Sequence, residues 1–423
     1  MQTSHIKLRL TVMNFLQFAV WGAYLTSMGR YLASAGFAEH IGSFYAMQGI
    51  VSLFMPALMG IVADRWVPAQ RLLGICHLLA GGLMFGLYLY TQSGSTLDYG
   101  MLFALYTLSV AFYMPTLALS NSVAYTSLEQ AGMDLVKSFP PIRVFGTVGF
   151  ICTMISVSLL GVESTSGQFA VSATIGLIQA LYSWTLPHCP TAPKGESKGL
   201  VEALGLRAFV LFRQRKMALF FVFSMLLGVS LQITNGFANP FINTFGEIPA
   251  YAETFGVKYA NILISLSQLS ETLCILLIPF ALRRFGIKNV MLIAMVAWVL
   301  RFGLLGLGDP GSGVWLFLLS MIVYGVAFDF FNVSGSLFVD KETDPSIRSS
   351  AQGLFMIMTN GIGATLGSLG AQAVVNHYVY SEYDAHAMLA GWSVSWYIFA
   401  AYAAVVALLF ALLFRYKGDV AEA

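Results

Sequence analysis

The chain has 423 residues, of which 57% are hydrophobic and only 10% charged, and its formal net charge is +2. Soluble proteins carry about 25% charged residues, so this composition is typical of an integral membrane protein and excludes an ordinary soluble domain. No basic block or glycine-rich phosphate loop suggests nucleic-acid binding. No CxxC motif or His/Cys cluster is present, so we expect neither a metal nor another cofactor. We expect Cys76, Cys152, Cys189 and Cys274 to be small buried hydrophobic residues.

A transmembrane helix needs about 20 predominantly apolar residues. Twelve segments of the chain meet this requirement. In chain order they are residues 8–33, 41–63, 72–92, 99–126, 140–162, 166–186, 217–243, 257–282, 287–307, 313–338, 347–375 and 390–414. No small-residue cleavage site follows the first segment, so we expect a retained span rather than a signal peptide. The sequence therefore predicts an all-α protein with twelve transmembrane helices.

A polar, proline-bearing and basic stretch separates the sixth segment from the seventh, and it reads HCPTAPKGESKGLVEALGLRAFVLFRQRK. This composition predicts a loop with a short amphipathic helix at the membrane surface. We therefore expect an N-terminal six-helix bundle over residues 1–190, a cytoplasmic linker over 191–215, and a C-terminal six-helix bundle over 216–423.

The distribution of Lys and Arg predicts the orientation, because cytoplasmic loops carry an excess of both. With both termini in the cytoplasm, nineteen of the 22 basic residues fall on the inner side. The other three are Arg30 and Lys258 on the outer side and Arg301 within a span. We therefore expect both ends of the chain to be cytoplasmic.

Short motifs recur in the two halves at an offset of six spans. PPIR (140–143) opens the fifth segment and PSIR (345–348) opens the eleventh, while AFY (111–113) in the fourth matches AFD (327–329) in the tenth. The loops GIVADRWVPAQR and FALRRFGIKN also occupy equivalent places. Two six-helix halves in parallel repeat are the architecture of a rocker-switch transporter, whose site lies at the membrane midplane between the halves.

Asp329 is the only acidic or basic residue in the apolar stretch WLFLLSMIVYGVAFDFFNVSGSLFV. A carboxylate at the centre of a membrane helix costs at least about 2.5–3.5 kcal/mol. Such a residue persists by facing a polar cavity, by finding a partner or by carrying a proton, and all three indicate transport. Because an apolar setting disfavours the charged form of a carboxylate, we expect Asp329 to bind and release a proton.

The segment GIVADRW, between the second and third spans, resembles a loop signature of the major facilitator superfamily. In that signature a glycine, an aspartate and following basic residues join the two spans, and the matching residues are Gly60, Asp64, Arg65 and Arg71. The resemblance implies a role in conformational gating. The alternative is ordinary positive charge at the cytoplasmic end of a span.

Two pairs of polar residues lie at i, i+3 spacing, which places both members on one helix face. They are Gln268 and Glu271 in the eighth segment and Gln232 and Asn235 in the seventh. A carboxylate with amides offers both acceptors and donors to a polar ligand with hydroxyl groups. The alternative is hydrogen bonding between helices, for which amides also serve in membranes.

Aromatic residues share faces with these polar positions. Tyr324 and Phe328 lie at i, i+4 in the tenth segment, and Arg143, Thr147 and Phe150 share a face of the fifth. Aromatic rings stack on flat heterocycles, although ordinary packing is the alternative for each ring. Arg143 lies near the cytoplasmic edge by span counting, where it would be a flanking charge.

Several longer runs are similar to those of one family. They are FMPALMGIVADRW, SFPPIRVFGTVGF, FSMLLGVSLQITN, ISLSQLSETL, IPFALRRFGIKNVM, SMIVYGVAFDFFNVSGS and SSAQGLFMIMTNG. From the first span to the end of the eleventh, the chain resembles the bacterial nucleoside:proton symporters of the major facilitator superfamily. The outer loop TFGEIPAYAETFGVKYAN and the region after Gly370 match less clearly.

The resemblance implies a nucleoside site between the two bundles. The contacts that carry over are Arg143, Thr147, Phe150, Gln232, Asn235, Gln268, Glu271, Tyr324 and Phe328. The intramembrane aspartate of the family, associated with proton coupling, matches Asp329, and Glu271 is a second candidate for the proton carrier.

We therefore expect a proton-coupled nucleoside importer of a bacterial inner membrane that works by alternating access and is functional as a monomer. Its partners would be nucleosides, protons and the lipid bilayer. Two alternatives stay open: a proton-coupled transporter of a sugar or another polar solute, and a membrane sensor without net flux. The serine, histidine and cysteine residues form no nucleophile–base pattern, so an enzyme is not expected.

Overall fold

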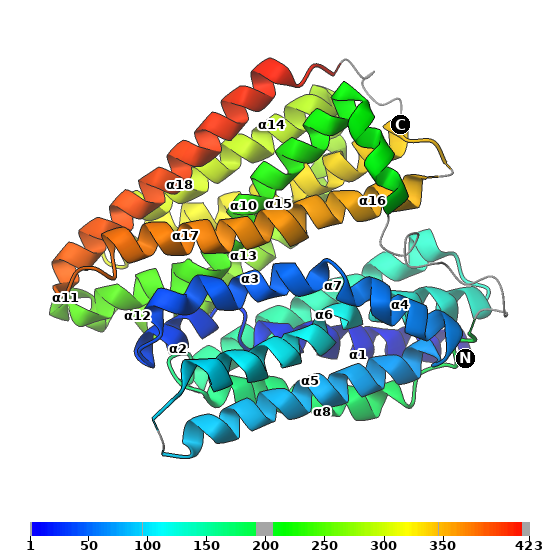
Figure 1. The fold of residues 1–423 in the computed structure, drawn as a ribbon, viewed down its shortest axis with the longest axis horizontal. Coiled ribbons are helices and arrows are strands. Elements are labelled where there is room, and N and C mark those ends of the chain that lie inside the picture. Colours follow the sequence, from blue (N-terminus) through cyan, green and yellow to red (C-terminus); the bar gives the residue numbers. More distant parts are fainter. Residues whose placement is uncertain (1, 95, 192–205, 346, 417–423) are drawn as a thin grey trace. The chain divides into compact units, whose positions relative to one another are not determined.

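The computed structural model describes residues 2–94, 96–191, 206–345 and 347–416, and all regular secondary structure in these ranges is helical (Figure 1). The chain divides into two compact units. The first comprises Met1–Tyr31 and Ile50–Leu204, and the second comprises Leu32–Gly49 and Gly205–Ala423. The second unit thus includes a short segment from the predicted first bundle, and the division into two six-helix bundles stays a prediction.

The helices of the first unit are mostly long. They are α1 (Gln2–Gly22), α2 (Met28–Ser34), α4 (Met55–Arg65), α5 (Ala69–Gln92), α6 (Tyr99–Gln130), α7 (Leu135–Leu159) and α8 (Gly167–Ser183), and α2 extends past the boundary between the units. Within this unit α1 packs along α7, and α5 packs against both α6 and α8.

The second unit contains the remaining helices, of which α3 continues past Gly49 into the first unit. They are η1 (Ala38–His40), α3 (Ile41–Ser52), η2 (Leu206–Arg213), α10 (Arg215–Thr244), η3 (Phe245–Glu247), α11 (Pro249–Ala252), α12 (Phe255–Lys258), α13 (Ala260–Cys274), η4 (Ile275–Leu277), α14 (Ile278–Leu307), α15 (Val314–Glu342), α16 (Arg348–Met356), the π-helix η5 (Ile357–Gly363), α17 (Ala364–Tyr378) and α18 (Ala385–Leu413). Here α14 packs along α15 and α18, and α13 packs along α15.

All twelve predicted segments coincide with helical structure, and several are broken into two pieces. In the described part of the chain, nine stretches are long and apolar enough to cross a membrane, and the longest of them is Ala260–Leu307. It covers the predicted segment 287–307 and, from residue 260 on, the predicted segment 257–282. Gly286 separates them with φ 74° and ψ 165°, a backbone conformation that glycine adopts without a steric penalty. The predicted boundary between the eighth and ninth spans is therefore a real break in the helix.

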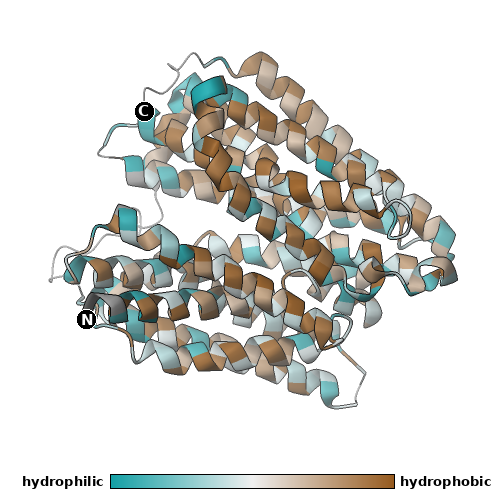
Figure 2. Cartoon of the chain, turned by 180° about the vertical axis from the view of Figure 1, so that it is seen from behind, coloured by the Kyte–Doolittle hydropathy of each residue, from teal (hydrophilic) through white to brown (hydrophobic). Residues whose placement is uncertain are grey.

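Large apolar side chains are exposed on the outer faces of the helices. Figure 2 shows hydrophobic residues along the lengths of the helices and hydrophilic residues concentrated near their ends. Leu181 and Leu276, for example, are 73% and 74% exposed. Apolar surface this extensive is rare on soluble proteins and is suited to lipid. Cys152 is also exposed, so the expectation of a buried residue is wrong at this position, whereas the other three cysteines are buried.

Two glycines allow α1 and α7 to approach closely. A Cβ atom on Gly149 would lie 2.2 Å from the carbonyl oxygen of Phe15, and one on Gly22 would lie 2.4 Å from the carbonyl oxygen of Phe150. Both distances are too short for any side chain. Small residues at such crossings are typical of membrane helices. The crossing therefore holds the backbone of Phe150 directly against α1.

We predict that Gly149→Ala destabilises the protein, because the added methyl group must push α1 and α7 apart. Overpacking of this kind costs about 1–3 kcal/mol. The free energy of unfolding, followed by tryptophan fluorescence in detergent, measures the loss. The matched control is Gly82→Ala in α5, where a Cβ meets nothing within 4 Å. Equal stability of the two variants would contradict a crossing that requires glycine.

Candidate substrate site

Close packing of α13 and α15 brings most of the predicted site residues of the second unit together. The Ser270 hydroxyl on α13 donates a hydrogen bond to the Ile322 carbonyl on α15. A Cβ atom on Gly325 would lie 2.5 Å from the Ser270 carbonyl oxygen, so the two backbones meet here with no room for a side chain. Glu271 follows Ser270 directly, and Asp329 lies about one turn after Gly325.

The predicted aromatic pair is present on α15. The rings of Tyr324 and Phe328 are stacked, with centroids 5.7 Å apart and an angle of 15° between their planes. Tyr324 is buried, and its hydroxyl is hydrogen-bonded to the side chain of Gln268 on α13. Phe328 is half-buried. An aromatic surface and an amide are thus held side by side by direct contact between two helices.

Asp329 and Glu271 lie close enough to repel each other when both are charged. Asp329 is only 6% exposed, and its Oδ2 atom has no hydrogen-bond partner among the described residues. None of the ion pairs in the described part of the chain involves Asp329. Burial and the neighbouring like charge both make it unfavourable for Asp329 and Glu271 to be charged at the same time. A buried carboxyl group of α15 thus lies close to a second carboxyl group on α13.

The predicted amide pair on α10 is also formed. Asn235 Nδ2 donates to Gln232 Oε1 at 2.7 Å, and both residues are half-buried. Gln232 Nε2 in turn donates to Gln48 Oε1 of α3 at 3.5 Å, at the outer limit of a hydrogen bond. Further along α10, Asn239 donates to Asn261 of α13 at 2.9 Å, and both are fully buried. The Asn239–Asn261 pair is hydrogen bonding between helices, whereas the Gln232–Asn235 pair stays partly accessible.

The predicted residues of the first unit lie on α7. The Arg143 guanidinium lies 4.0 Å above the ring of Phe18 and is half-buried. Phe150 is 6% exposed and packs edge-on against Trp21, with ring centroids 6.3 Å apart. Thr147, one turn before Phe150, is half-buried. The three residues therefore share one face of α7, as the spacing predicts.

The start of α7 differs from the predicted start of the fifth span. The predicted span begins at residue 140, whereas α7 begins at Leu135. Arg143 therefore lies eight residues into the helix, about 12 Å along its axis at 1.5 Å per residue. The place of Arg143 relative to the cytoplasmic edge stays a prediction. Two prolines at 140 and 141 hide this start from sequence reasoning, because proline is usually read as a helix beginning.

A buried polar network in the first unit was not predicted. His77 Nε2 is 2.8 Å from Gln17 Oε1, and Gln17 Nε2 donates to Thr116 Oγ1 at 2.7 Å. The Thr116 hydroxyl donates to the Tyr113 carbonyl, so it must accept from Gln17, and His77 Nε2 must then carry the proton. Tyr113 packs against Trp21, the neighbour of Phe150. These partners are 60 to 99 residues apart in sequence, so no local pattern reveals them.

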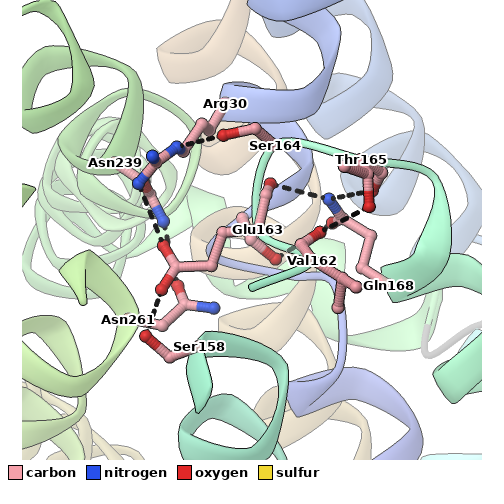
Figure 3. Close-up of polar contacts among 10 residues, drawn as sticks. Arg30, Ser158, Val162, Glu163, Ser164, Thr165, Gln168, Asn239 and Asn261 are labelled. Atoms are coloured by element: carbon pink, nitrogen blue, oxygen red, sulfur yellow. Dashed lines mark hydrogen bonds and ion pairs between the residues drawn. The ribbon is translucent and has the colours of Figure 1, made fainter. Parts of the chain in front are cut away.

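A second polar cluster ties α2 to the loop between α7 and α8 (Figure 3). Arg30 Nε donates to the Ser164 hydroxyl at 2.5 Å, and Arg30 Nη1 lies 3.4 Å from the Glu163 carboxylate. Glu163 also accepts a hydrogen bond from Ser158, and its backbone carbonyl accepts one from Gln168 at 3.0 Å. Arg30 is one of the two basic residues predicted on the outer side, and here it is paired with a carboxylate of its own unit.

The residues of the predicted gating loop flank the short connection between α4 and α5. Gly60 and Asp64 lie in α4, Arg65 is its last residue, and Arg71 lies in the first turn of α5. Asp64, Arg65 and Arg71 are exposed. The positions are those of a loop signature, and the gating role itself stays a prediction.

The comparisons with known proteins agree on one family. The family model described as Nucleoside H+ symporter matches residues 4–419. The chain is 47% identical to the xanthosine permease of Escherichia coli (strain K12) over 417 residues, which cover 98% of this chain and 97% of that protein. It is also 47% identical to the nucleoside permease NupG of the same strain over 416 residues, with the same coverage.

A crystal structure of the nucleoside transporter NupG matches with a TM-score of 0.91 and 46% identity, and it covers 97% of this chain and 100% of that chain. The match confirms the predicted major facilitator fold. The relatives are transport proteins, which confirms that the chain is not an enzyme. This chain is therefore a multi-pass membrane protein, and it belongs to the nucleoside H+ symporter family.

Proposed function

We propose that this chain is a proton-coupled nucleoside importer of a bacterial inner membrane and that it works by alternating access. The match to the nucleoside H+ symporter family over residues 4–419 carries this proposal. Relatives named as xanthosine and nucleoside permeases match nearly the whole chain. A nucleoside is thereby favoured over the sugar or sensor alternatives, and nucleosides and protons are the substrates.

The cluster on α13 and α15 supplies the proposed nucleoside contacts of the second unit. The stacked rings of Tyr324 and Phe328 offer apolar surface to a flat base. Base–aromatic stacking is worth about 1–3 kcal/mol per base. Gln268 and Glu271 offer a donor and acceptors to ribose hydroxyls or base edges. One pair of helices therefore carries groups for both parts of a nucleoside.

Five further residues, two on α10 and three on α7, complete the proposed set of nucleoside contacts. The hydrogen bond between Gln232 and Asn235 uses one donor of Asn235 and one acceptor site of Gln232. An amide side chain has two donors and two acceptor sites, so each residue keeps further groups for a ligand. In the first unit we propose Arg143, Thr147 and Phe150 as contacts, because they share one face of α7. The guanidinium of Arg143 is held above Phe18, which fixes its position before a ligand binds.

We propose that Asp329 carries the coupled proton, with Glu271 as its partner. Asp329 lies next to Phe328 on α15 and within electrostatic reach of Glu271 on α13. Protonation of either group removes the repulsion between them. A ligand shifts a conformational equilibrium only through its different affinity for the two states. Because the proton and the base contacts share α15, a change of charge at Asp329 acts directly on the helix that holds the nucleoside.

The orientation and the gating loop complete the proposal. We propose that both termini are cytoplasmic, as the positive-inside distribution predicts. Asp64, Arg65 and Arg71 would then lie at the cytoplasmic surface, where charged contacts can form and break as the transporter changes state. We also propose that the monomer in the lipid bilayer is the working unit.

We predict that Asp329→Asn abolishes uphill transport but leaves nucleoside binding intact. Asparagine keeps the shape of the side chain and cannot release a proton, so a proton gradient no longer drives accumulation. The measurement is uptake of labelled uridine into liposomes with an acidic exterior and an alkaline interior. Exchange of uridine without a gradient should continue.

The matched control is Asp340→Asn, the same change at an exposed position of α15 whose ion pair with Arg348 lies at the surface. Surface ion pairs contribute little, so this variant should accumulate uridine like the unmodified protein. Gradient-driven accumulation by Asp329→Asn would remove Asp329 as the coupling group.

We predict that Glu271→Gln weakens nucleoside binding by about tenfold or more, since hydrogen bonds to charged groups are worth about 1.5–3 kcal/mol. Equilibrium binding of uridine to purified protein gives the dissociation constant. Glu253→Gln in the exposed loop near Lys258 is the control, and its affinity should not change. An unaltered dissociation constant for Glu271→Gln would exclude this residue from the site.

A further inference from the structure

Arg301 is a buried cation that the proposed site does not use. It lies within α14 and is 2% exposed, which makes it one of the largest fully buried side chains of the described residues. Arginine stays charged in proteins. A charge within a membrane span is energetically costly, so charged residues there are rare and mark functional positions. Among the ion pairs of the described residues, none contains Arg301. The role of Arg301 therefore has to be sought in its contacts with uncharged groups.

The neighbours of Arg301 belong to the two helices that carry the proposed nucleoside contacts. Arg301 Nη1 donates to the Ser320 carbonyl of α15 at 2.8 Å and to the Ser267 hydroxyl of α13 at 3.3 Å. The Ser320 hydroxyl donates back to the Arg301 carbonyl at 2.9 Å. The guanidinium thus joins α14 to both α13 and α15. The hydrogen bond from Ser320 to the Arg301 carbonyl adds a second link between α14 and α15.

The guanidinium also lies over the ring of Tyr324, with its central carbon 4.4 Å from the ring centroid. A cation at this distance is attracted by the electrons of the ring face, and the attraction is stronger where water is absent. Tyr324 is buried, and Trp298 of α14 packs edge-on against it at 5.9 Å. The same ring is stacked with Phe328 and hydrogen-bonded to Gln268. Arg301 therefore contacts the one residue that joins the aromatic and amide parts of the proposed site.

We propose that Arg301 is a positioning residue that sets nucleoside affinity through Tyr324 without touching the nucleoside. It holds the Tyr324 ring parallel to Phe328 and keeps the hydroxyl on Gln268, so the surface for the base is in place before the base arrives. This inference rests on the proposed function, because it requires Tyr324 to be a nucleoside contact. A preorganised site binds more tightly than one that must be ordered on binding.

The test is a double-mutant cycle in purified protein, read as the dissociation constant of uridine. Arg301→Gln should weaken binding about tenfold, and Arg301→Lys should weaken it less because an ammonium group also binds an aromatic face. In a Tyr324→Ala background, Arg301→Gln should have no further effect, since the ring that it positions is gone. In a Tyr324→Phe background the effect should persist, because the ring remains.

Two comparisons separate this role from a general structural one. Arg284→Gln removes the same group from an exposed position of α14, and its affinity should equal that of the unmodified protein. If Arg301→Gln weakens binding equally with and without the Tyr324 ring, the positioning role is wrong. Should Arg301→Gln fail to fold, Arg301→Lys takes its place in the cycle. The expected loss of uridine affinity is then smaller, and it should again be absent in the Tyr324→Ala background.

The same data keep the two proposals apart. Unchanged affinity in Tyr324→Ala contradicts the proposed nucleoside site itself. Weakened affinity in Tyr324→Ala, together with full affinity in Arg301→Gln, overturns only the positioning role of Arg301.

Discussion

The contact between α13 and α15 is the interaction on which the rest of the site depends. Gly325 has no side chain, so the α15 backbone meets Ser270 of α13, and the Ser270 hydroxyl bonds to the Ile322 carbonyl. In a membrane, where apolar burial does not drive helices together, such close packing and hydrogen bonding between helices stabilise the fold. The same contact places Glu271 beside Asp329, and Gln268 beside Tyr324. The contact that packs the two helices together therefore also brings the side chains of the proposed site together.

The charges around this crossing follow a consistent arrangement. Asp329 is buried, close to a second carboxylate, and forms no ion pair among the described residues. Arg301, the nearby buried cation, is held by a carbonyl, a hydroxyl and an aromatic ring. A direct ion pair would keep a carboxylate charged, and none of the ion pairs in the described ranges holds Asp329 in that form. The Tyr324 ring lies under the guanidinium of Arg301, and its hydroxyl is hydrogen-bonded to Gln268, one turn before Glu271.

Much of this could be predicted from sequence because the signals are local. Apolar length gives the spans, and i, i+3 or i, i+4 spacing gives the shared faces of Gln268 and Glu271 or Tyr324 and Phe328. The start of α7 at Leu135 could not be predicted, because two prolines mask it. The His77–Gln17 contact and the neighbours of Arg301 depend on packing between different helices, which no spacing within one helix reveals. Sequence reasoning places Arg301 within a span, and only the structure shows that it is buried and which ring it covers.

The central claim is that nucleoside and proton act on the same pair of helices. Titration calorimetry of uridine binding in buffers with different ionisation enthalpies tests it most directly, because any proton bound with the nucleoside is taken from the buffer. Binding of the two ligands must then be linked, with each raising the affinity for the other. The account predicts net proton uptake on nucleoside binding near neutral pH, seen as an observed enthalpy that changes with the buffer. An enthalpy independent of the buffer across that pH range would contradict it.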